Sequence, residues 1–132
     1  MAEAIDLPNT AEVASVSEIG KVRRVVAAAA SEVLGSDVGA DVALVVSELI
    51  TNALEHGDDG MVAVEYGSTV DGFVLAVGSP SSGLPIERKG PVPDTDTRGR
   101  GLRIVSAIAD VVDVTQADGS VVVRCRFGPR RR

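Results

Sequence analysis

The sequence predicts an α+β fold in which helices cover one face of a β-sheet. Two long stretches in the first half of the chain place apolar residues three and four positions apart, which is the spacing of a buried helical face. Later stretches rich in β-branched residues are separated by Asp-Gly turn signals, a pattern typical of hairpins. The predicted order is a strand, two helices, two strands, a long loop, a helix and two strands, and it indicates a sheet covered by helices.

The first elements are a short strand and a helix. Ala4–Leu7 is the predicted strand, because a Pro-Asn turn signal follows it. Ser15 and Glu18 have the spacing of a capping box, in which the serine side chain accepts an amide hydrogen bond and the glutamate reaches back to the cap. A helix is then expected over Val16–Leu34, with Gly35 as its stop.

The middle of the chain combines a second helix with a hairpin. Apolar residues at helical spacing predict a helix over Ser36–His56. Met61–Tyr66 and Phe73–Val77 read as two strands of a hairpin, joined by a loop that contains Asp71 and Gly72.

The last third of the chain begins with a long loop. Gly78–Gly101 is rich in Gly, Pro, Ser and charge, and connections of that length in a compact domain are usually functional lids or disordered segments; we expect a function here. A helix over Leu102–Asp110 and strands over Val111–Thr115 and Ser120–Phe127 follow. Cys125 alternates with two arginines on the last strand, so we expect it to face the core as a small apolar group without a functional role.

Length and composition favour one globular domain. The chain has 132 residues, of which 45% are hydrophobic and 24% charged, and we assign residues 1–129 to the domain and residues 130–132 to a basic tail. The net charge is −6, although three of the thirteen basic residues are the terminal arginines. A domain with this net negative charge repels the phosphates of nucleic acids, and its three aromatic residues offer little surface for base stacking. Both features argue against direct nucleic-acid binding.

The single cysteine and the N-terminal sequence both bear on the cellular compartment, and the cysteine count favours a reducing one. One cysteine and one histidine can make neither an internal disulfide nor a zinc site. The N-terminus lacks the basic and apolar segments of a signal peptide, and its longest nearby apolar run, Val25–Ala30, is far below the roughly 20 residues of a membrane span. We therefore expect a cytoplasmic protein without a membrane partner.

Two groups of residues could carry chemistry. Glu48, Asn52 and His56 are four apart and form a polar line beside the apolar face of the second helix. They could line a ligand site, or they could be a solvated edge with His56 interacting with the negative end of the helix.

The second group precedes the third helix. Gly99 and Gly101, flanked by Arg98 and Arg100, could let backbone amides approach an anion at a helix N-terminus. The alternative is a flexible loop with solvated charges. The segment is not a Walker loop, because no Gly-Lys-Ser/Thr follows, and it does not follow a strand as a dinucleotide fingerprint does.

Together these motifs resemble a known ATP-binding superfamily. The helix box from Glu48 to His56, followed some forty residues later by Gly99-Arg100-Gly101-Leu102 at a helix start, resembles the GHKL fold of DNA gyrase, Hsp90, histidine kinases and MutL. Within it the sequence most resembles the small bacterial anti-sigma-factor serine kinases. The resemblance implies a two-layer α/β sandwich with a mixed, mostly antiparallel sheet, and a nucleotide bound between the helices and a lid.

The resemblance also implies roles for individual residues. Asn52 matches the asparagine that holds Mg²⁺, a hard cation that prefers oxygen ligands, and Glu48 matches the proposed general base. His56 ends the same box, where a supporting structural role is expected. The cofactors would be ATP and Mg²⁺, and the nucleotide-binding positions would be Asn52, Ser79, Gly83, Arg98, Gly99, Arg100, Gly101 and Leu102.

The sequence departs from the family pattern at the adenine anchor. The family has an Asp that accepts a hydrogen bond from the adenine amino group, and this chain has Ser79 there, followed by Pro80. A neutral hydroxyl can still accept that bond, but it contributes about half as much as a carboxylate, so ATP affinity is expected to fall by roughly tenfold or more.

The resemblance implies a homodimeric protein serine kinase that sequesters a sigma factor and phosphorylates a serine of an anti-anti-sigma protein. One alternative is a partner-binding module without kinase activity, in which Ser79 has weakened the nucleotide site. A histidine-kinase catalytic domain is less favoured, because such domains normally follow a phosphoacceptor helical hairpin, for which the 132 residues leave no room. The Ala27–Ala30 run also lacks the sustained heptads of a dimer coil.

Overall fold

The computed structural model describes residues 7–56, 60–70, 72–80, 100–117 and 119–129. None of the helices in these ranges is both long and apolar enough to cross a membrane. In chain order the elements are β1 (Asn9–Val13), a 3-10 helix η1 (Val16–Glu18), α1 (Ile19–Leu34), α2 (Ser36–His56), β2 (Val62–Thr69), β3 (Gly72–Pro80), α3 (Arg100–Ile108), β4 (Val111–Ala117) and β5 (Ser120–Phe127).

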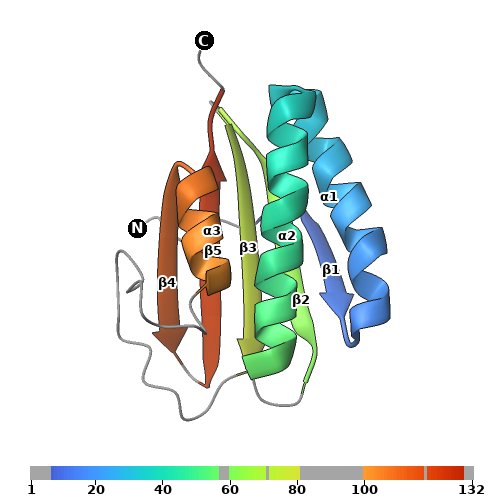
Figure 1. Ribbon diagram of the computed structural model, residues 1–132, viewed down its shortest axis with the longest axis vertical. Helices are drawn as coiled ribbons and strands as arrows, with labels where there is room; N and C mark the ends of the chain where they lie inside the picture. The colour runs from blue at the N-terminus through green and yellow to red at the C-terminus, as the bar shows by residue number, and fades with distance from the viewer. Residues whose placement is uncertain (1–6, 57–59, 71, 81–99, 118, 130–132) are drawn as a thin grey trace.

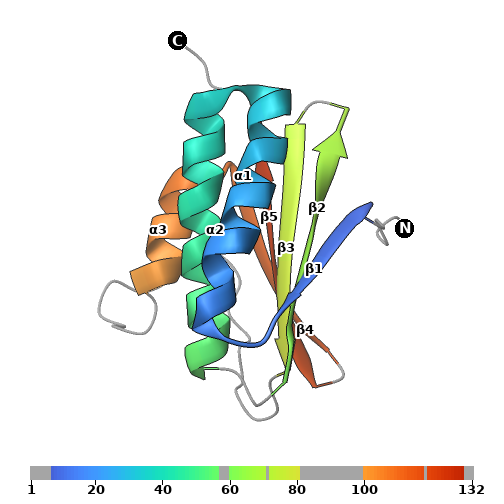
Figure 2. The same ribbon diagram turned by 90° about the vertical axis from the view of Figure 1, so that its right-hand side faces the viewer.

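The strands form one sheet, and the helices cover one of its faces. The strand order is β1-β2-β3-β5-β4, and all four neighbouring pairs are antiparallel. Two views a quarter-turn apart show α1, α2 and α3 on the same side of this sheet (Figure 1, Figure 2). The predicted α+β sandwich is confirmed, as are the hairpins of β2 with β3 and of β4 with β5.

The core lies between the two layers. The apolar stripes of α1 and α2 supply fully buried side chains such as Val26, Val42 and Ile50, and β3 contributes Phe73 and Leu75 from the facing side. Each such side chain stabilises the fold by about 1.5–3 kcal/mol relative to an exposed one.

The start of the helical layer follows the predicted capping signal. The Glu18 carboxylate accepts hydrogen bonds from the backbone amides of Ala14 at 2.6 Å and of Ser15 at 3.2 Å. The half of the capping box that was assigned to Glu18 is therefore confirmed, and it fixes the turn that leads from β1 into α1.

The predicted first strand is wrong in position. Of Ala4–Leu7 only Leu7 is in the described part of the chain, and it precedes β1, which begins at Asn9. Leu7 is buried against Val74 and Ala76, which point away from the helices. Its apolar character therefore serves to cover the outer face of the sheet rather than to continue a strand.

Two boundaries of the predicted long loop also differ. Gly78, Ser79 and Pro80 belong to β3, where they pair with Val122, Val121 and Ser120 of β5. The strand therefore extends three residues beyond its predicted end at Val77. The third helix begins at Arg100 instead of Leu102 and ends at Ile108.

Candidate functional site

Three elements converge at one end of the sandwich. The C-terminal half of α2, the last residues of β3 and the first turn of α3 all point to the end that lies at the bottom of Figure 1. The predicted site residues in the described part of the chain lie on these three elements. The topology therefore brings together segments that are about fifty residues apart in the sequence.

Glu48 and Asn52 lie one helical turn apart on α2. Both are half-buried, whereas Glu55 on the same helix is exposed. Their immediate neighbours Leu49 and Ile50 are part of the core. A fully solvated edge would leave Glu48 and Asn52 as exposed as Glu55, so the structure favours a partly enclosed position for this pair.

Within the described residues, no hydrogen bond or ion pair joins the Glu48 or Asn52 side chain to another residue. Half-buried polar groups usually have partners, so a carboxylate and an amide that have none among the described residues are suited to bind a ligand. His56 is the last residue of α2, and its side chain lies outside the described part of the structure.

Ser79 faces the helical layer from the end of β3. It continues the row of Leu75 and Val77, which pack into the core under the helices. Its backbone pairs with Val121 of β5, and its side chain is half-buried. The strand alternation therefore places the Ser79 side chain on the face of the sheet that the helices cover.

The first turn of α3 offers backbone donors at the same end. Arg100, Gly101 and Leu102 form this turn, so the two predicted glycines do not both precede the helix. The first four amides of an α-helix have no partner within the helix, and together with the helix dipole they favour an anion. The predicted positions Gly83, Arg98 and Gly99 lie outside the described residues.

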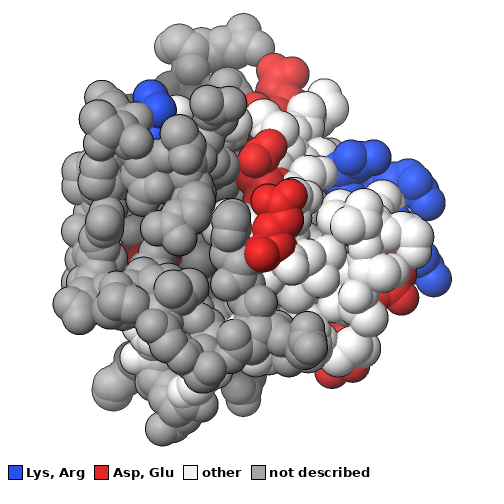
Figure 3. All heavy atoms as spheres, turned by 60° about the horizontal axis from the view of Figure 1, so that its bottom comes forward, with Lys and Arg blue, Asp and Glu red and all other residues white. Residues whose placement is uncertain are grey.

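Acidic side chains lie on the described surface at this end. An end-on view shows a row of them beside the part of the surface that is not described (Figure 3). In the described ranges no cluster of three or more His, Cys, Asp or Glu side chains could hold a metal ion by itself. The amide oxygen of Asn52 suits Mg²⁺, which would take its remaining ligands from phosphate and water.

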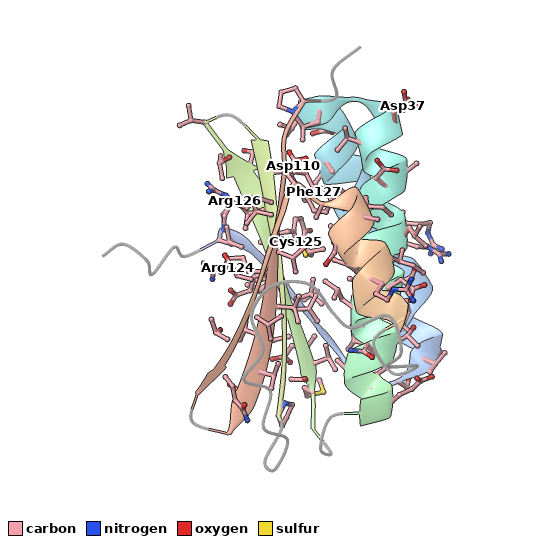
Figure 4. All side chains as sticks on the ribbon, turned by 60° about the vertical axis from the view of Figure 1, so that its left-hand side comes forward. Asp37, Asp110, Arg124, Cys125, Arg126 and Phe127 are labelled. Carbon is pink, nitrogen blue, oxygen red and sulfur yellow. The ribbon has the colours of Figure 1, made fainter. Side chains whose placement is uncertain are left out.

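A separate hollow lies at the opposite end of the sandwich. Its volume is about 440 Å³, and it contains none of the predicted site residues. Two of its lining residues, Asp110 and Phe127, lie at the end of the sheet near the start of α2, which Asp37 marks (Figure 4). Its lining residues in the described part of the chain are Val38, Asp41, Ile108, Asp110, Phe127, Gly128 and Pro129.

The sequence matches the family of histidine kinase-like ATPase domains over residues 11–127. This match spans β1 to β5 and includes the segments that form the candidate site. The chain therefore belongs to this family, which is part of the GHKL superfamily of ATP-binding domains. A comparison with curated protein sequences found no significant match.

Solved structures share the fold at low sequence identity. The catalytic domain of histidine kinase ThkA superposes with a TM-score of 0.59 at 16% identity, over 91% of this chain and 97% of that domain. The Erythrobacter litoralis blue-light activated histidine kinase EL346 gives 0.55 at 18% identity, over 83% of this chain and 41% of that protein. Acinetobacter baumannii histidine kinase AdeS gives a TM-score of 0.52 at 14% identity, over 70% of this chain and 48% of that protein. The chain thus spans less than half the length of the last two kinases.

Ser79 was predicted as a site residue, but not as part of a strand. The alternation of Leu75, Val77 and Ser79 continues the inward-facing row by one position and indicates that the strand extends this far. Pro80 argues against a longer strand, but the sheet tolerates it because it is the last residue of β3.

Proposed function

We propose that this chain is an ATP-dependent protein serine kinase of the anti-sigma-factor type. The observation that carries the proposal is the half-buried pair Glu48 and Asn52, which lies on α2 at the end where α3 begins. Membership of the histidine kinase-like ATPase family supports ATP as the nucleotide. The choice of serine as acceptor, of a sigma factor and an anti-anti-sigma protein as partners, and of a homodimer rests on the sequence resemblance.

The proposed reaction transfers the γ-phosphoryl group of ATP to a serine hydroxyl. Glu48 accepts the hydroxyl proton, the serine oxygen forms a bond to the γ-phosphorus, and the bond to the β-phosphate oxygen breaks to release ADP. Mg²⁺, when bound, offsets the charge that develops on the phosphate oxygens. Asn52 would hold this ion, and the first-turn amides of α3 would bind the phosphates.

Glu48 gives the sharpest test of the kinase proposal. Glu48→Gln keeps the shape of the side chain but cannot accept the proton, so we expect phosphoryl transfer to a candidate antagonist to fall at least about hundredfold with little loss of ATP affinity. Glu55→Gln, on the exposed side of the same helix, is the matched control. Transfer that survives in Glu48→Gln, or wild-type protein that binds MgATP and never phosphorylates a cognate antagonist, contradicts the proposal.

A second candidate is a partner-binding module with a weakened nucleotide site. The observation that favours it is Ser79, a neutral residue at the position where the family has Asp. Calorimetry with MgATP separates the two: binding that is detectable only after Ser79→Asp supports the module, and measurable binding by the wild type, even if Ser79→Asp binds more tightly, supports the kinase. Light scattering at micromolar concentration tests the proposed homodimer, and a monomer contradicts that part.

A further inference from the structure

The backbone of Ser79 is held in the sheet at the end of β3. The Ser79 backbone pairs with Val121, and the next residue, Pro80, pairs with Ser120. Pro80 also lies so close to Gly60 that a Cβ built on that glycine would be 2.7 Å from the proline Cγ. The backbone of Ser79, and with it the point from which its side chain leaves the sheet, is therefore held in place at the end of β3.

The described neighbours of Ser79 on the sheet offer its hydroxyl no hydrogen-bond partner. Its cross-strand neighbour Val121 is apolar, and so is Val77, the preceding residue on the same face. Within the described residues no hydrogen bond joins the Ser79 side chain to another residue. A half-buried hydroxyl in this position keeps both its donor and its acceptor capacity for a ligand.

These two capacities have a consequence for base selection. An ionised carboxylate only accepts hydrogen bonds, so at this position it selects a purine with an amino group at C6 and repels one with a carbonyl oxygen there. A hydroxyl can accept from the amino group or donate to the carbonyl oxygen by rotating about its C–O bond.

We infer that Ser79 makes this nucleotide site accept 6-oxopurine nucleoside triphosphates as well as ATP. The inference rests on the proposed function, since it takes the nucleotide base to lie against the end of β3. It adds a specificity that the family assignment does not imply, because that assignment concerns the fold and the ATP-binding class, whereas this selectivity follows from one uncharged side chain.

The test compares ATP with ITP, which carries an oxygen at C6 and no amino group at C2. Each nucleotide is titrated with Mg²⁺ into the full chain by calorimetry. We expect wild-type dissociation constants for the two nucleotides within about fivefold of each other. In Ser79→Asp we expect ATP to bind more tightly and ITP more weakly, so that ATP is preferred at least about thirtyfold. Ser68→Asp, an exposed serine on β2, is the matched control and should keep the wild-type ratio.

The outcomes separate this inference from the function on which it rests. A wild-type preference for ATP of more than about thirtyfold overturns the inference and leaves the nucleotide site intact. Absence of binding of either nucleotide to both the wild type and Ser79→Asp overturns the inference together with the proposed ATP site. Ser79→Ala provides a check that does not add charge: it should weaken ATP and ITP by the same factor, and a loss confined to ATP contradicts the inference.

Discussion

Gly39 of α2 lies directly against Ser31 of α1. A Cβ built on Gly39 would collide with the Ser31 hydroxyl and would lie 3.0 Å from the carbonyl oxygen of Ala27. Gly39 is buried, and it occupies the first turns of α2, where the chain has just left α1 through Gly35. The closeness of the two helices, and so the position of α2 over the sheet, depends on the missing side chain at this residue.

Gly39→Ala is therefore expected to destabilise the fold, although alanine is the better helix former. The clash with the α1 backbone should cost about 1–3 kcal/mol in the free energy of unfolding, which exceeds the propensity gain of up to about 1 kcal/mol. Gly20→Ala on α1 is the matched control, because the nearest atom to its added Cβ is an arginine terminus at 3.6 Å. Chemical denaturation should show loss in the first variant and gain in the second; equal gains would contradict the close contact.

Cys125 is fully buried in the core, as its alternation on the last strand predicts. Figure 4 shows its side chain on the helical side of β5, with Arg124 and Arg126 on the other side. Burial raises the pKa of the Cys125 thiol from 9.0 to about 12, and the nearby Asp113 carboxylate adds to this shift. The thiol therefore stays neutral in the folded protein at any physiological pH.

This shift gives a stability prediction with a definite sign. Between pH 9 and pH 12 the unfolded chain loses the thiol proton and the folded protein keeps it, so the free energy of unfolding falls as pH rises. The expected slope from this group is about 1.4 kcal/mol per pH unit. Denaturation curves of Cys125→Ala should lack that component of the slope. Rapid labelling of folded wild type by a thiol reagent at neutral pH would also be inconsistent with a buried, neutral thiol.

Glu18 allows a test of the turn between β1 and α1. Its carboxylate accepts the amides of Ala14 and Ser15, so Glu18→Ala should cost about 0.5–1.5 kcal/mol. Glu18→Gln keeps an acceptor oxygen and should lose less than half of that amount. Glu32→Ala, at an exposed position inside α1, is the control for the loss of a surface glutamate. The capping account fails if the alanine variants at positions 18 and 32 are equally stable.

The long periodic elements could be predicted from sequence because burial and periodicity agree in them. In α2 the apolar residues at helical spacing are the ones that the core contains, for example Val42, Val46 and Ile50. The edge strand β1 has too few buried apolar residues to show a clear period, since only Ala11 and Val13 of its five residues pack inward. Leu7 misled the prediction because it covers the outer face of the sheet, and no local pattern reports which face a single apolar residue will meet.

The candidate site was predictable where it lies on a regular element. The spacing of Glu48 and Asn52 predicts that they share one side of a helix, whereas the arrangement of α2, β3 and α3 at the same end of the sandwich depends on packing. The start of α3 at Arg100 was missed because glycine at positions 99 and 101 weakens any helical signal. Tertiary contacts, which sequence spacing does not encode, decide such boundaries.

Asn52 provides the test of the cation side of the site. Thermal unfolding of the wild type should show a larger upward shift with ATP and Mg²⁺ than with ATP and a chelator, because ligand that binds only the folded state stabilises it by about 2.7 kcal/mol at a hundredfold excess over the dissociation constant. Asn52→Ala removes the amide oxygen that would hold the ion, so the increment due to Mg²⁺ should be lost while a smaller shift with ATP alone remains.

Thr51→Ala is the matched control for Asn52→Ala. Thr51 is half-buried and adjacent on α2, but it is a quarter-turn away from the line of Glu48 and Asn52. Its replacement should change the baseline melting temperature without changing the increment due to Mg²⁺. If Asn52→Ala keeps the full increment and Thr51→Ala loses it, the ion is held from a different side of the helix, and the phosphates would then lie away from Glu48.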